Sequence, residues 1–132
     1  MRVLPFLDQD GYDRLLWACD CNFVRGEDSF VRAQWAARPF VWHIYPTEDG
    51  AHWVKLAAFL ARHTGGMERA RAGAVTALWE AWNRGEALGR AWPDYAACLP
   101  ALAPQAEAWA DRLARQADLV TQLVDFADNV LN

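Results

Sequence analysis

Residues 22–45 read NFVRGEDSFVRAQWAARPFVWHIY, and this stretch decides the fold. It begins and ends with apolar runs, Asn22–Val24 and Phe40–Tyr45, whose β-branched and aromatic residues are typical of strands. Between them, Phe30–Ala37 has the spacing of a helix and is followed by a proline. A strand, a helix and a second strand in this order predict a parallel sheet with a right-handed crossover.

The residues before this stretch predict one further strand and one further helix. Arg2–Phe6 is a short apolar run that we expect to form a third strand. Gly11–Ala18 has an apolar face, and Asp10 is placed to cap it. The fold class is therefore α/β, with a short parallel sheet.

The residues after this stretch are rich in alanine and have a helical period, so the C-terminal half is expected to be helix-rich. The predicted helices cover Ala51–His63, Met67–Asn83, residues 86–98 and Pro104 to about Val130. Tryptophans at positions 79, 82 and 109 fall on these helices. We expect them in the core or in an interface rather than in a cofactor site.

The composition of the chain limits the classes of function that it can have. The chain has 132 residues, of which 54% are hydrophobic and 23% charged, and its net charge is −4. One folded domain is expected, and a disordered chain is excluded. The acidic balance argues against a nucleic-acid partner. No apolar run has the length of about 18 residues that a membrane span needs, and the N-terminus lacks a signal-peptide core, so a cytoplasmic protein is expected.

The loop Arg25–Ser29 is the first candidate for chemistry, because it follows the carboxyl end of a strand and precedes a helix. Gly26 lets a backbone approach a ligand, while Arg25 and Ser29 offer donors to a diphosphate. Glu27 and Asp28 oppose an anion unless they bind ligand hydroxyls or cap the helix. The alternative is an ordinary helix N-terminus, with Asp28 or Ser29 as its cap.

Two further pairs lie near the expected edge of the sheet. Phe6 and Gln9 follow the first predicted strand, where Phe6 can stack on a base or simply pack in the core. His43 and Tyr45 are two residues apart on the last strand and therefore face the same side. That side is either a pocket wall or a face packed under a helix.

These residues carry a resemblance to a known family. The run RGEDSFVRAQW at 25–35, together with LPF at 4–6, YDRLLW at 12–17 and PFVWHIY at 39–45, closely resembles the EarP family. Members of this family are bacterial protein-arginine rhamnosyltransferases that modify an arginine of translation elongation factor P. The resemblance is dense over residues 3–60 and fades in the alanine-rich half.

The resemblance implies a GT-B glycosyltransferase with two Rossmann-like lobes. Residues 1–132 would form the C-terminal lobe, which binds the donor dTDP-β-L-rhamnose, and the N-terminal lobe that carries the general-base aspartates and recognises elongation factor P would be absent. The family inverts the anomeric carbon and uses no metal or cofactor. By this resemblance Phe6 and Gln9 contact the thymine; Arg25, Asp28 and Ser29 contact the diphosphate and ribose; Tyr45 lines the donor pocket; and Glu27 is an acid needed for activity.

Two departures from the family pattern lie near this site. Ala37 stands where the family has glycine, and residues 47–50 differ from the usual turn, which leaves Glu48 without a role.

Two functions follow as expectations. The first is the donor-binding half of the rhamnosyltransferase, which we expect to be inactive alone because the acceptor guanidinium needs a base that this chain does not supply. The second is a non-enzymatic interaction module. It would dock through an apolar face of its last helix that includes Trp109, Leu113 or Leu123, since GT-B proteins commonly pack that helix on the other lobe.

Overall fold

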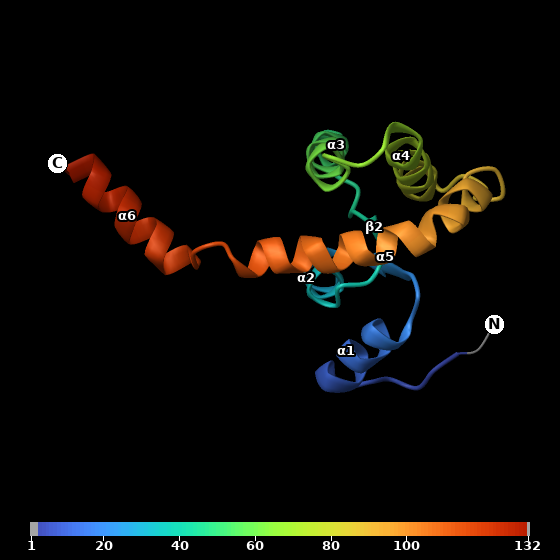
Figure 1. Ribbon diagram of the computed structural model, residues 1–132, viewed down its shortest axis with the longest axis horizontal. Helices are drawn as coiled ribbons and strands as arrows, with labels where there is room; N and C mark the ends of the chain where they lie inside the picture. Colours follow the sequence, from blue (N-terminus) through green and yellow to red (C-terminus); the bar gives the residue numbers. More distant parts are fainter. Residues whose placement is uncertain (1–2, 132) are drawn as a thin grey trace.

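The computed structural model describes residues 3–131 and has two strands and six helices in that range. The elements are α1 (Gln9–Ala18), β1 (Asn22–Arg25), α2 (Glu27–Trp35), β2 (Phe40–His43), α3 (Ala51–His63), α4 (Arg69–Arg84), α5 (Trp92–Ala114) and α6 (Leu119–Leu131). Figure 1 shows α5 crossing the middle of the molecule, with α3 and α4 on one side and α1 on the other.

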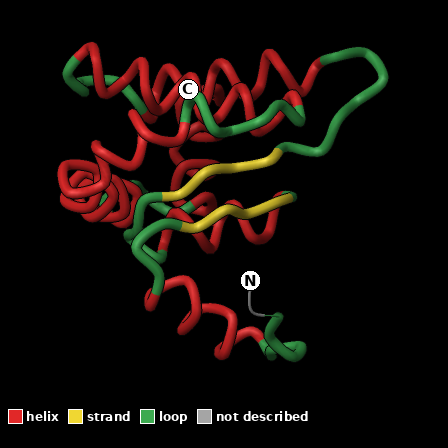
Figure 2. Tube along the Cα trace, turned by 90° about the vertical axis from the view of Figure 1, so that its right-hand side faces the viewer, coloured by secondary structure: helices red, strands yellow, loops and turns green. Residues whose placement is uncertain are grey.

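The two strands pair in parallel, which confirms the predicted strand–helix–strand unit. Asn22 lies opposite Phe40 and Arg25 opposite His43, so both strands end at the same edge of the sheet (Figure 2). Among the described side chains, Asn22 is the one buried polar residue, and its amide donates to the Leu16 carbonyl oxygen at 3.0 Å. This bond ties the end of α1 to the start of β1.

Aromatic rings fill the core between the sheet and the helices. Phe30 of α2 stacks on Trp42 of β2 with ring centroids 4.0 Å apart. Phe59 of α3 lies in contact with Trp79 of α4, at 5.7 Å. Trp79 is completely buried, and Trp109 of α5 is only 7% exposed, so these two tryptophans of the predicted stripe are core residues. Trp82 is partly buried and packs against that core.

The prediction of a strand over Arg2–Phe6 is wrong for the part that the structure describes. Residues 3–8 form no strand, and Arg2 lies outside the described residues. Pro5 has no N–H to donate to a ladder, and the Phe6 side chain is 100% exposed, so this run has no partner to pair with. The cap of α1 is Asp8 rather than Asp10, and its carboxylate accepts from the Gly11 N–H at 2.8 Å.

The C-terminal helices also differ from the prediction. No helix opens at Pro104; instead α5 begins at Trp92 and contains both Pro100 and Pro104. Each proline removes one backbone hydrogen bond, and Figure 1 shows a bend in α5. Buried Tyr95 and Leu102 anchor this helix on the core and offset that loss. The helical conformation is then interrupted before α6, where the Asp118 carboxylate accepts from the Val120 and Thr121 N–H groups.

Helix α6 extends away from the other elements (Figure 1). Six of its apolar side chains are 53% to 70% exposed: Leu119, Val120, Leu123, Val124, Phe126 and Val130. The expectation of an exposed apolar face is confirmed for Leu123, while Trp109 lies instead in the core. None of the helices within residues 3–131 combines the length and apolarity that crossing a membrane requires.

We predict that Ala37→Gly stabilises the chain. Ala37 has a φ of +54°, in the left-handed region that costs an L-residue about 1 kcal/mol or more, whereas glycine enters it freely. Because glycine also gains entropy in the unfolded chain, the net gain in unfolding free energy should be about 0.5–1 kcal/mol. Urea denaturation measures it.

The neighbouring position supplies the control for this variant. Ala36 has a φ of −65° and is buried, so Ala36→Gly should cost about 1 kcal/mol. Equal destabilisation by both variants would contradict the claim that the backbone of Ala37 is strained.

We also predict a stability loss in acid that depends on His63. Burial among the core rings, and next the positive charge of Arg112, lower the pKa of His63 from 6.5 to about 4. The unfolded chain therefore takes up this proton first as the pH falls. The contribution of neutral His63 to the free energy of unfolding is fully present above pH 6.5 and is lost as the pH falls toward 4. This loss amounts to about 3 kcal/mol. Urea denaturation across this range should show a shallower loss in His63→Phe, which keeps a ring on Phe59; identical pH profiles would contradict the prediction.

Candidate functional site

Gly26 joins β1 to α2 and is fixed from three directions. Its N–H donates to the His43 carbonyl oxygen at 3.1 Å, and its own carbonyl oxygen accepts from the Trp42 indole N–H at 2.9 Å. Its φ of +81° and ψ of −174° lie in a region that is essentially restricted to glycine. A Cβ built at Gly26 would meet the Tyr45 ring at 2.8 Å. This geometry sets where α2 starts.

Helix α2 starts at Glu27, three residues earlier than the sequence predicts, and neither Asp28 nor Ser29 caps it. Gly26 is the N-cap residue, and no side chain within residues 3–131 caps the first N–H groups. Those groups carry the positive end of the helix dipole and lie where β1 ends. The first turn of α2 is therefore open to an anion.

A cavity of about 660 Å³ lies beside this helix start, between α2 and the segment that leads into α1. It brings together four of the predicted site residues, Phe6, Gln9, Asp28 and Ser29. Phe6 is completely exposed, so the reading of Phe6 as a core residue is wrong. The cavity thus places a free aromatic ring and several polar groups around one space.

Asp28 is held in place by a network of charges. Its carboxylate accepts from Arg32 Nε at 3.0 Å, one helical turn away. The same guanidinium donates through Nη1 to both carboxylate oxygens of Asp13 on α1, at 3.0 and 2.9 Å. The bonds from Asp13, and next from Asp28, raise the pKa of Arg32. Arg32 lines the cavity and also joins α2 to α1.

Arg25 and Tyr45 lie together on the other side of Gly26, and neither lines the cavity. The Arg25 guanidinium carbon is 5.3 Å from the centre of the Tyr45 ring. Both side chains are exposed, so Tyr45 forms part of an open surface rather than a face packed under a helix. His43 has a different role. It is half-buried against Trp82, and burial, followed by the charge of Arg25, lowers the pKa of His43.

Glu27 is exposed and lies at the first position of α2, between these two groups. Its carboxylate is well placed at the positive end of the helix, but it does not line the cavity. The seven predicted residues therefore fall into one set in the cavity and one set beside it, and the Gly26 junction connects them.

Three residues that support this arrangement escaped the sequence reasoning. Arg32 follows Asp28 by four residues, a spacing that indicates an ion pair on a helix. Its second partner, Asp13, is 19 residues away, and no local pattern marks that contact. Asn83 of α4 donates to the Trp42 carbonyl oxygen at 2.8 Å and accepts from the Ile44 N–H at 3.0 Å, so it fixes the chain just before Tyr45.

Within residues 3–131, no three His, Cys, Asp or Glu side chains gather as a metal ion would require. The three cysteines are free thiols. Cys21 contacts the hydroxyl group of Tyr95, and burial raises the pKa of Cys21 to about 11. Cys21 therefore packs as a neutral thiol.

Comparison with known proteins gives a consistent family. A family model described as "Elongation-Factor P (EF-P) rhamnosyltransferase EarP" matches residues 1–128. The protein-arginine rhamnosyltransferase of Pseudomonas putida is 50% identical over 131 residues, which are 99% of this chain and 35% of that protein. The one from Pseudomonas aeruginosa is 49% identical over 126 residues, which are 96% of this chain and 34% of that protein. The chain thus spans about a third of the length of these relatives.

A solved structure agrees with this result. It comes from work on the structural basis of EarP-mediated arginine glycosylation of translation elongation factor EF-P. It superposes with a TM-score of 0.80 and 48% sequence identity, over 97% of this chain and 40% of that one. The α/β fold with a short parallel sheet and a helix-rich C-terminal half is therefore confirmed.

We predict that Gly26→Ala damages the site through both backbone and side chain. The backbone strain and the contact with Tyr45 together should lower the free energy of unfolding by about 2–3 kcal/mol. Gly85→Ala is the matched control, because Gly85 also has a positive φ but nothing lies within 4 Å of its Cβ position. It should cost about 1 kcal/mol.

A double-mutant cycle separates the two causes. Tyr45→Ala should relieve part of the cost of Gly26→Ala, as measured by urea denaturation. Purely additive costs would show that the Tyr45 ring does not rest against Gly26.

Proposed function

Because the chain belongs to the EarP family of elongation factor P rhamnosyltransferases, we propose that it is the nucleotide-sugar-binding lobe of a protein-arginine rhamnosyltransferase. The observation that carries the proposal is the cavity with Phe6, Gln9, Asp28 and Ser29 beside the uncapped start of α2. A nucleotide needs an aromatic surface for its base and oriented donors for its phosphates. This edge of the sheet offers both.

The donor we propose is dTDP-β-L-rhamnose. The thymine stacks on Phe6, an interaction worth about 1–3 kcal/mol, and hydrogen-bonds to Gln9. The diphosphate binds the first N–H groups of α2, the Ser29 hydroxyl and the Arg25 guanidinium. Asp28, held by Arg32, accepts from the ribose hydroxyl. Tyr45 lines the sugar end of the site, where Arg25 already contacts it.

The reaction we propose is transfer of rhamnose to an arginine of elongation factor P with inversion at the anomeric carbon. The helix start and Arg25 stabilise the charge that develops on the departing diphosphate. Glu27 orders this end of the donor site through its position at the first turn of α2. No metal or other cofactor is needed for these steps.

Activation of the acceptor requires groups outside this chain. The pKa of a guanidinium is about 12 or more, so arginine is a poor nucleophile near pH 7 without a carboxylate to orient or deprotonate it. We propose that aspartates of an N-terminal lobe, such as the additional length of the relatives would contain, supply that base and bind elongation factor P. The chain alone should not glycosylate elongation factor P, and turnover by the purified chain would overturn this assignment.

The exposed apolar face of α6 favours a second candidate, a non-enzymatic module that docks on a partner. In the donor-lobe proposal the same face packs on the remainder of a larger enzyme. Donor binding distinguishes the two functions, because a docking module has no need of a nucleotide site. A chain that stays monomeric in light scattering at high concentration would contradict a docking role.

We predict that the folded chain binds dTDP, as measured by isothermal titration calorimetry. Arg25→Ala should weaken binding about tenfold through the loss of one charge-assisted hydrogen bond, and Ser29→Ala somewhat less. Arg90→Ala is the control, because Arg90 is an exposed arginine outside both groups of site residues. No binding by well-folded protein, or equal loss in the control, would contradict the proposed donor site.

A further inference from the structure

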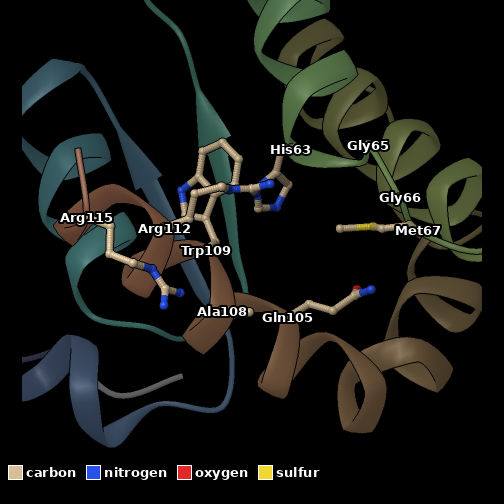
Figure 3. A pocket seen from close by; sticks show the side chains of 9 residues that line it. All are labelled: His63, Gly65, Gly66, Met67, Gln105, Ala108, Trp109, Arg112 and Arg115. Atoms are coloured by element: carbon tan, nitrogen blue, oxygen red, sulfur yellow. The ribbon is translucent and has the colours of Figure 1, made fainter.

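A second cavity lies at the opposite end of the sheet from the nucleotide site. It has a volume of about 360 Å³ and opens between the end of α3, the turn that follows it, and α5 (Figure 3). Its floor includes His63, whose ring lies 5.4 Å from that of Phe40, the first residue of β2. Arg25 is the last residue of β1, and Gly26 and Tyr45 follow the strands at that same, opposite end. The two cavities share no lining residue.

Two side chains that line this cavity carry buried polar atoms without partners among the described residues. His63 Nδ1 and Gln105 Oε1 are buried and form no hydrogen bond with any described residue. Figure 3 shows His63 and Gln105 approaching the space from α3 and α5. A buried polar atom left unpaired costs about 1–3 kcal/mol, so a ligand that pairs with both atoms gains that energy.

The mouth of the cavity is positively charged. Arg112 of α5 and Arg115, the residue that follows this helix, line it, and both are exposed. The Arg112 guanidinium carbon lies 4.5 Å from the centre of the Trp109 ring, which holds the charge in one place. Of the residues that the structure describes, no Asp or Glu lines the cavity, so no carboxylate there neutralises the two guanidinium groups.

Gly65 and Gly66 complete the wall with backbone alone. Among the described residues, their N–H groups form none of the backbone hydrogen bonds found outside the helices and strands. Met67, Ala108 and the face of Trp109 add an apolar side. The cavity therefore combines two guanidinium groups for an oxyanion, a side-chain carbonyl acceptor for a hydroxyl, and an apolar wall for a short carbon chain.

We propose that this cavity binds a small hydroxylated oxyanion, such as a polyol phosphate. The anionic group binds Arg112 and Arg115 at the mouth, and a hydroxyl group donates to Gln105 Oε1 in the depth. His63 enters the complex as a neutral imidazole, which offers one donor and one acceptor. Its pKa of about 4 agrees with that role near neutral pH. The proposal does not depend on the nucleotide site.

NMR spectroscopy of the 15N-labelled chain tests the proposal with three probes, glycerol 3-phosphate, inorganic phosphate and glycerol. The imidazole signals of His63 and the indole N–H signal of Trp109 report on the cavity. Glycerol 3-phosphate should shift both signals and bind most tightly, inorganic phosphate should bind about tenfold more weakly, and glycerol should cause no shift.

Variants distinguish anion binding in this cavity from a general attraction of anions to exposed arginines. Arg112→Gln should weaken the binding of both anions about tenfold. Gln105→Leu should reduce the affinity for glycerol 3-phosphate to that for inorganic phosphate. Arg90→Gln, the matched loss of one exposed arginine elsewhere, should change neither. The dispersion of the amide spectrum verifies that each variant is folded, and dTDP affinity should be unchanged in all of them.

Three results would overturn the proposal. The first is the absence of any shift at His63 and Trp109 with either anion. The second is a shift that Arg112→Gln leaves unchanged, or that Arg90→Gln removes equally, since the anion would then bind elsewhere. Equal affinities for glycerol 3-phosphate and inorganic phosphate would overturn the role of the hydroxyl group and of Gln105.

Discussion

Gly26 is the residue on which the arrangement of the proposed nucleotide site depends. Two hydrogen bonds, to His43 and from Trp42, fix its peptide groups against β2, and its backbone conformation turns β1 directly into α2. The Tyr45 ring occupies the space that a side chain at this position would need. One glycine therefore places the open start of α2, the Arg25–Tyr45 pair and the cavity lined by Asp28 and Ser29 next to one another.

The interactions around this junction are of two kinds. Buried rings of the core, such as Phe30 on Trp42, hold α2 against the sheet and supply stability. Polar contacts instead fix how the elements are oriented, because Arg32 joins Asp13 and Asp28, and Asn83 fixes the chain after β2. The first kind tolerates changes of similar volume, whereas the second depends on exact donor and acceptor positions. For this reason we expect donor binding to be more sensitive than stability to substitutions of the polar set.

The sequence was sufficient for the strand–helix–strand unit, because apolar alternation and helical spacing are local properties. It failed where long-range packing overrides a local pattern. Arg2–Phe6 reads as a strand but has no neighbour to pair with, and Pro104 reads as a helix start but lies inside a helix anchored by Tyr95 and Leu102. The sequence pattern predicts the start of α2 three residues late, because Gly26 has no side chain to mark it as a cap and is held there by tertiary hydrogen bonds.

The candidate site was predictable to a similar degree. Element spacing alone identified the loop Arg25–Ser29 and placed Phe6, Gln9 and Tyr45 near it, and the family resemblance assigned their roles. The contact of Asp13 with Arg32 joins residues far apart in the chain, and the cavity around His63 is formed by α3 and α5, so no motif marks either of them.

The most direct test of the central claim is to map dTDP on the chain by amide chemical-shift perturbation. We expect the largest shifts at the N–H groups of Glu27, Asp28 and Ser29, with smaller shifts near Phe6 and Gln9. Saturating dTDP that leaves these amides unmoved, or moves those of Gly65 and Gly66 instead, would contradict the claim.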